Sequence, residues 1–82
     1  MKFRVNVTVT LKDGVLDPQG LTIGHALNDL GFETVSSVKT GKLFFLEIDA
    51  DTEEGAAKIA EDAASKLLAN PIIEVFKIEV ER

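Results

Sequence analysis

The residues of this chain that could act in catalysis are few and poorly spaced. The chain has one histidine, His25, and no cysteine, so it lacks a set of ligands with metal-binding spacing. The candidate nucleophiles Ser36, Ser37 and Ser65 have no general base at a recognisable spacing. We therefore expect His25 to be a solvated or boundary residue, and we expect no catalytic residue on this chain.

Acidic pairs and glycines, which often mark active sites, fit structural roles here. The pairs Glu53-Glu54, Glu61-Asp62 and Glu79-Glu81 fall at a helix start or on solvated faces, where carboxylates seldom have the shifted pKa that acid-base catalysis needs. The glycines have neither the spacing of a phosphate-binding loop nor that of a dinucleotide fingerprint. We expect no bound metal or cofactor.

Length and composition narrow the class of protein further. The 82 residues fit a single domain, 1–82, that buries only about 60 to 65 per cent of its unfolded surface. With no cysteine to form a disulfide, self-association is the remaining source of stability. The net charge of −5 argues against binding to nucleic acid or to an anionic membrane. The longest apolar run, Leu43 to Leu46, is too short to span a bilayer, and nothing near Met1 marks secretion, so we expect a cytoplasmic protein.

The elements that would position any site follow from periodicity. Apolar residues alternate from Phe3 to Leu11, which predicts a half-buried strand. Asp17 can cap a helix that begins at Pro18, and Gly31 can end it in the left-handed conformation. This helix carries one apolar stripe at helical spacing, made of Ile23, Ala26, Leu27 and Leu30.

The middle of the chain predicts a hairpin. Residues 34–39 and 42–49 have strand character, and Thr40-Gly41 between them suits a tight turn. In the second strand Leu43 and Phe45 share a face with two carboxylates, so they should point away from the core.

A second helix should begin at Asp51 and end at Asn70-Pro71, and a last strand should follow over 72–80. The predicted order is β-α-β-β-α-β. This order is typical of the α+β ferredoxin-like sandwich, with a four-stranded antiparallel sheet and two helices on one of its faces. Leu43 and Phe45 would lie on the uncovered face.

Three segments resemble one known family. They are Thr10 to Gly20, which contains Leu-Asp-Pro-Gln-Gly, then Gly41-Lys42 leading into Leu46-Glu47, and Leu67 to Glu74, which reads Leu-Leu-Ala-Asn-Pro-Ile-Ile-Glu. Over essentially its whole length the chain is similar to the PurS family, the small subunit of phosphoribosylformylglycinamidine (FGAM) synthase.

This resemblance implies a non-catalytic bridging subunit of an ATP-dependent, glutamine-hydrolysing carbon-nitrogen ligase in purine biosynthesis. The implied partners are a second copy of the chain, as a homodimer or homotetramer, a large synthetase subunit (PurL-type) and a glutaminase subunit (PurQ-type). ATP and magnesium would be bound by the synthetase subunit, and no cofactor by this chain.

We expect the interfaces to involve Leu43 and Phe45 on the uncovered face and the residues of two family segments, Asp17, Pro18, Gln19, Gly20, Asn70 and Pro71. A ferredoxin-like regulatory domain that binds a small molecule is the alternative function, since it would share the same order of elements. An acylphosphatase-like enzyme fits less well, because its anion-binding loop needs an arginine and neither Arg4 nor Arg82 lies on the loop that follows the first strand.

Overall fold

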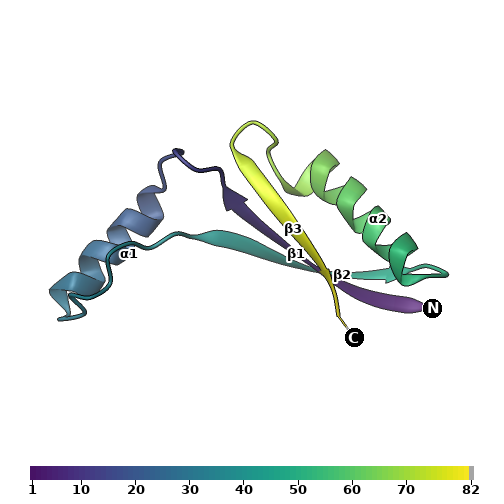
Figure 1. Cartoon of the computed structure of the whole chain (residues 1–82), viewed down its shortest axis with the longest axis horizontal. Helices are drawn as coiled ribbons and strands as arrows, with labels where there is room; N and C mark the ends of the chain where they lie inside the picture. The colour runs from purple at the N-terminus through teal and green to yellow at the C-terminus, as the bar shows by residue number, and fades with distance from the viewer. Residues whose placement is uncertain (82) are drawn as a thin grey trace.

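The computed structural model describes residues 1–81, in which three strands alternate with two α-helices (Figure 1). In chain order the elements are β1 (Lys2–Leu11), α1 (Pro18–Asp29), β2 (Gly41–Asp49), α2 (Glu53–Ala63), the π-helical turn η1 (Ala64–Leu68) and β3 (Glu74–Val80).

The three strands form one antiparallel sheet in the order β2-β1-β3. At its centre Val7 of β1 lies opposite Phe44 of β2 and Ile78 of β3. Every second residue of β1 faces the core, so that Val5, Val7 and Val9 are almost completely buried. The alternation seen in the sequence therefore identifies the central strand.

Helix α2 packs on one face of this sheet. Its alanines at positions 56, 60 and 64 lie four residues apart on one side of the helix and have no exposed surface. Such small side chains let the helix approach the valines of β1 closely. Thr52, not Asp51, is the N-terminal cap, because its Oγ1 accepts a hydrogen bond of 3.0 Å from the backbone N–H of Gly55.

The prediction of a four-stranded ferredoxin-like sheet is wrong, since the sheet has three strands. Residues 35–40 are extended without belonging to the sheet, and no hairpin forms at Thr40-Gly41. The backbone N–H of Thr40 is bound by Asp17 instead, and Gly41 already pairs with Thr10. A tight two-residue hairpin would need a positive φ at the glycine, and among residues 1–81 only Gly14 and Gly31 have one.

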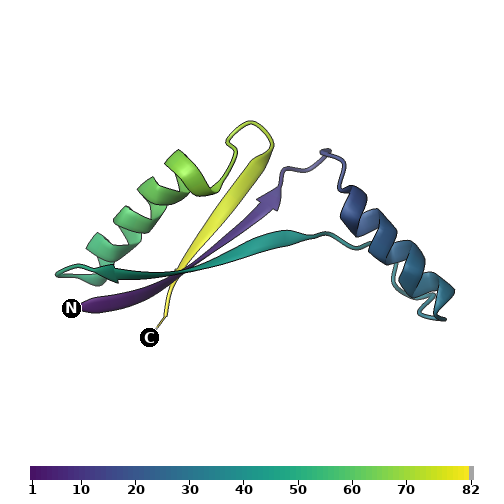
Figure 2. The same ribbon diagram turned by 180° about the vertical axis from the view of Figure 1, so that it is seen from behind.

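The expectation that both helices cover one face of the sheet is wrong as well. Figures 1 and 2 show α1 beyond the end of the sheet, on the far side from α2, where it lies along the extended residues 35–40. The molecule is accordingly elongated, with extents of 50 × 28 × 13 Å. Residues 12–40, which leave the sheet after β1 and return at β2, are called the arm below.

Candidate functional site

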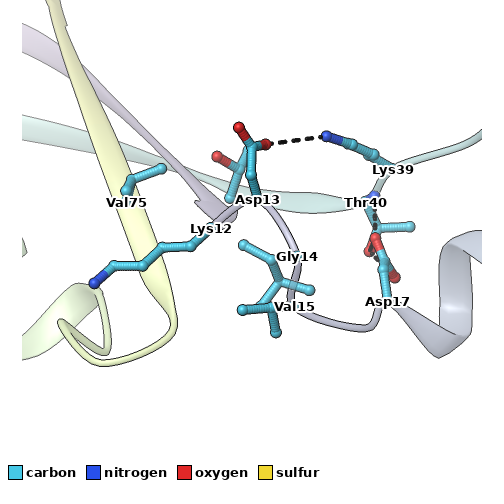
Figure 3. A pocket seen from close by; sticks show the side chains of 10 residues that line it. Lys12, Asp13, Gly14, Val15, Asp17, Lys39, Thr40 and Val75 are labelled. Carbon is cyan, nitrogen blue, oxygen red and sulfur yellow. Dashed lines mark hydrogen bonds and ion pairs between the residues drawn. The ribbon is translucent and has the colours of Figure 1, made fainter.

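Asp17 connects the two ends of the arm, where the chain leaves the sheet after β1 and returns to it at β2 (Figure 3). Its carboxylate accepts hydrogen bonds from the backbone N–H of Gly20 at 2.8 Å and of Thr40 at 2.7 Å, and from the Thr40 hydroxyl at 3.0 Å. The first bond caps α1, as the sequence predicts, and the other two fix α1 to the start of β2. The bond from the Thr40 backbone, then that from Gly20, lowers the pKa of Asp17 against a smaller opposing effect of desolvation.

A hollow of about 410 Å³ lies beside this contact, between the end of β1 and the arm. Asp13 and Lys39 line it and form an ion pair, with 3.5 Å between Nζ and Oδ1 (Figure 3). Both side chains are well exposed, so this pair contributes little to stability. Both carboxylate oxygens of Asp17 accept hydrogen bonds from the chain itself, which gives this residue a structural role.

The segment before β3 reaches the same end of the sheet. The backbone N–H of Lys12 donates to the carbonyl of Ile73 at 2.8 Å, and Lys42 pairs with the largely buried carboxylate of Glu74 at 3.7 Å. Gln19 lines a second, smaller hollow together with Lys42 and Glu74. The three family segments thus meet at one place, called the hinge end below and formed by residues 10–20, 39–42 and 70–74.

Asn70 and Pro71 shape the turn that enters the hinge end. The Asn70 side-chain oxygen accepts a hydrogen bond of 3.0 Å from the N–H of Ile72, while the Asn70 N–H donates to Glu74 Oε1 at 2.7 Å. Pro71 is exposed and lines a hollow of about 300 Å³ with Val75. Asp17 and Asn70 are therefore held by hydrogen bonds to the backbone of the chain itself, whereas Pro18, Gln19 and Pro71 present their side chains to solvent.

Leu43 and Phe45 lie apart from the hinge end, on the sheet face opposite α2. Their side chains are 52% and 64% exposed. Phe45 is paired across the sheet with Asn6, whose Oδ1 atom is buried and has no hydrogen-bond partner within residues 1–81. Leu43 and Phe45 thus form an exposed apolar pair on the sheet face that α2 leaves uncovered.

The residues considered for catalysis are scattered. His25 is exposed on α1, and Ser65 donates to the carbonyl of Asp62 at 3.2 Å. Over residues 1–81 no cluster of three or more histidine, cysteine or acidic side chains is arranged to hold a metal ion. Neither helix in this part of the chain is long and apolar enough to cross a membrane.

Thr40 and Glu74 make contacts at this site that the sequence did not predict. Thr40 lies 23 positions from Asp17, and no local pattern indicates that the two side chains meet. The pairing of Glu74 with Lys42 likewise depends on β1 lying between their two strands.

The comparisons with known proteins agree with one another. The family model described as "PurS: Phosphoribosylformylglycinamidine (FGAM) synthase" matches residues 4–82. The chain is 41% identical to phosphoribosylformylglycinamidine synthase subunit PurS of Methanocaldococcus jannaschii, with 98% of this chain and 96% of the relative covered. It is 38% identical to the Bacillus subtilis subunit, over 96% of this chain and 93% of that one.

Solved structures give the same result. The crystal structure of the M. jannaschii PurS matches with a TM-score of 0.87 and 42% identity, covering 98% of this chain and 96% of the other. A chain in the structure of PurLQS from Thermotoga maritima matches with a TM-score of 0.91 and 30% identity, over 99% of both chains. On these findings, together with the three segments that meet at the hinge end, this chain belongs to the PurS family of FGAM synthase.

Proposed function

We propose that this chain is the small bridging subunit of FGAM synthase, which holds a PurL-type synthetase and a PurQ-type glutaminase together. The observation that carries this proposal is the match, over nearly the full length of both chains, to a chain in the PurLQS structure. In this role the subunit serves the conversion of formylglycinamide ribonucleotide to its amidine in the cytoplasm. ATP and magnesium are bound by the synthetase subunit.

A bridging subunit acts through proximity. Ammonia released by a glutaminase diffuses away unless the synthetase site is held nearby, and linking the two raises the effective ammonia concentration at the second site. No chemical barrier is lowered by the bridge itself, so it needs no reactive side chain. The scattered positions of His25 and Ser65, together with the structural role of Asp17, fit this requirement.

Two surfaces are suited to the partner subunits. At the hinge end, Pro18, Gln19 and Pro71 are exposed on a backbone fixed by the Asp17 and Asn70 hydrogen bonds. Such a preorganised backbone reduces the entropy lost on binding. The second surface is the sheet face with Leu43 and Phe45, which offers apolar area for a second copy or for a partner.

Reconstitution tests the proposal directly. Synthase activity is measured with glutamine and then with ammonium, using the synthetase and glutaminase subunits with and without this chain. We expect glutamine-dependent activity to require the chain and ammonium-dependent activity to survive its omission. Full glutamine-dependent activity from the other two subunits alone would refute the bridging role, and glutamine or ATP hydrolysis by this chain alone would refute its non-catalytic nature.

A further inference from the structure

The turn that leads from β1 into the arm contains a reactive pair of residues, Asp13 and Gly14. Asp13 is the only aspartate or asparagine of the chain that a glycine follows. A backbone nitrogen can attack the side-chain carboxyl group of the residue before it, and glycine places no side chain beside that nitrogen. In helices and strands the reaction is suppressed, because hydrogen bonds hold the nitrogen in place.

The surroundings of this pair are open to solvent. The Asp13 side chain is fully exposed, and its ion pair with Lys39, at 3.5 Å, lies in water and holds it weakly (Figure 3). A Cβ atom built on Gly14 would meet no other atom within 4 Å. The side chain of Asp13 can therefore swing toward the Gly14 nitrogen without a clash.

The peptide group between the two residues is free to rotate. The Val15 N–H donates to the Lys12 carbonyl at 3.1 Å and closes a β-turn, and the φ of 84° at Gly14 is that of a type II turn. Within residues 1–81 neither the Asp13 carbonyl nor the Gly14 N–H takes part in a hydrogen bond. Turning this peptide group over gives a type I turn, which glycine also accepts, and breaks no hydrogen bond.

Other aspartates precede nitrogen atoms that the fold holds in place. The Ala50 N–H, which follows Asp49, donates a backbone hydrogen bond of 2.9 Å. Ala63, which follows Asp62, lies inside α2, where the helical hydrogen bonds fix its nitrogen. The combination of a free nitrogen and an exposed carboxyl group distinguishes Asp13 from both.

We propose that Asp13 is a site of spontaneous isoaspartate formation in the folded chain. The Gly14 nitrogen attacks Cγ of Asp13, the new C–N bond closes a succinimide ring, and the amide proton leaves with a carboxyl oxygen as water. A solvent water then opens the ring. Attack at Cγ restores aspartate, whereas attack at the main-chain carbonyl carbon breaks its bond to the Gly14 nitrogen, so that the chain runs through the former side chain. One water is released and one is taken up, and the mass is unchanged.

Isomerisation alters the base of the arm. The backbone gains one carbon atom between Lys12 and Val15, so the hydrogen bond that closes the turn is lost. The carboxylate moves onto the main chain, which breaks the ion pair with Lys39 at the other end of the arm. The proposal concerns the chain alone and does not depend on its role in the synthase.

Ageing of the full chain tests the proposal. The folded protein is kept for weeks at neutral pH and physiological temperature and digested with trypsin, and the peptide 13–39 is analysed by chromatography and electron-transfer fragmentation. We expect a second form of this peptide, of unchanged mass, with isoaspartate at position 13, which an isoaspartyl methyltransferase also labels. A chain without isoaspartate at position 13, or with a larger yield elsewhere, would overturn the proposal.

A matched pair of variants separates the effect of the fold from that of the following residue. Asp13→Asn and Asp62→Asn place an amide in the turn and in α2, and an amide closes the same ring with loss of ammonia. The rate of deamidation is measured for each variant in the folded state and in urea.

We expect the two rates at position 13 to agree within about threefold, because the turn opens at little cost, and folding to slow the reaction at position 62 by about tenfold or more. The proposal fails if folding slows the two positions by the same factor, since the turn would then protect Asp13 as well as a helix does.

Discussion

Two glycines in α1 should respond in opposite ways to the same substitution. Gly20 and Gly24 lie one helical turn apart, and at both the change to alanine removes the helix-breaking cost of glycine, a gain of about 1 kcal/mol. A Cβ on Gly24 would lie 3.7 Å from a methyl group of Val38, an ordinary contact. A Cβ on Gly20 would overlap the carbonyl oxygen of Val38 and would lie 3.0 Å from the carboxylate of Asp17.

The overlap at Gly20 decides the sign of the effect. The blocking atom belongs to the backbone of the extended segment, which the Asp17 to Thr40 hydrogen bonds hold against the helix. Overpacking of this kind costs about 1 to 3 kcal/mol. We expect Gly24→Ala to stabilise the protein by about 1 kcal/mol, and Gly20→Ala to destabilise it by up to about 2 kcal/mol.

Urea unfolding combined with amide exchange of α1 measures both changes. For a chain of this size 1 kcal/mol moves the urea midpoint by about 0.5 to 1 M. Gly24→Ala should raise the midpoint and slow exchange in α1, whereas Gly20→Ala should lower the midpoint and speed exchange. If both variants stabilise the protein equally, the close contact between α1 and Val38 does not exist.

Three further predictions concern the other surfaces. Phe45→Glu should shift any dimer or tetramer that uses the open sheet face toward smaller species in sedimentation, because burying Phe45 is worth about 1.5 to 3 kcal/mol. The pKa of Asp17 is lowered from 3.8, so its contribution to stability should be fully present above pH 3.8 and should be lost as the pH falls through the lower pKa of the folded protein. Asp17→Asn should remove this part of the pH dependence of unfolding. Gln19→Ala should weaken assembly with the partner subunits by pull-down without changing the unfolding midpoint, whereas His25→Ala should change neither.

Local signals in the sequence predicted the elements well. The alternation around Val7 identified a strand whose inward residues are buried, and the Asp17-Pro18 pair located the start of α1 to the residue. Gly31 has the positive φ of 102° expected at the end of that helix. In each case the cause lies within a few residues of the signal, in side-chain alternation or in a cap.

The error in the sheet arose where a local pattern competed with a distant contact. Thr40-Gly41 has the composition of a tight turn, but Asp17 binds Thr40 from 23 positions away and keeps the chain straight. The sequence could not predict the hinge end for the same reason, because Lys12, Lys42 and Glu74 meet only once β1 lies between β2 and β3. Family resemblance identified the segments, but only the fold shows that they are neighbours.

The wrong prediction of where α1 lies and the proposed function have a common physical origin. The helical periodicity predicts that Ile23 and Leu30 are buried, but it does not predict which chain provides the surface that covers them. This 82-residue chain, whose largest fully buried side chains are those of Val5, Val7 and Val9, cannot bury more by itself while Asp17 directs its arm outward. Apolar surface that a monomer leaves exposed is the driving force for assembly. A chain built in this way gains its stability from the other copies and subunits it joins, as a bridging subunit must.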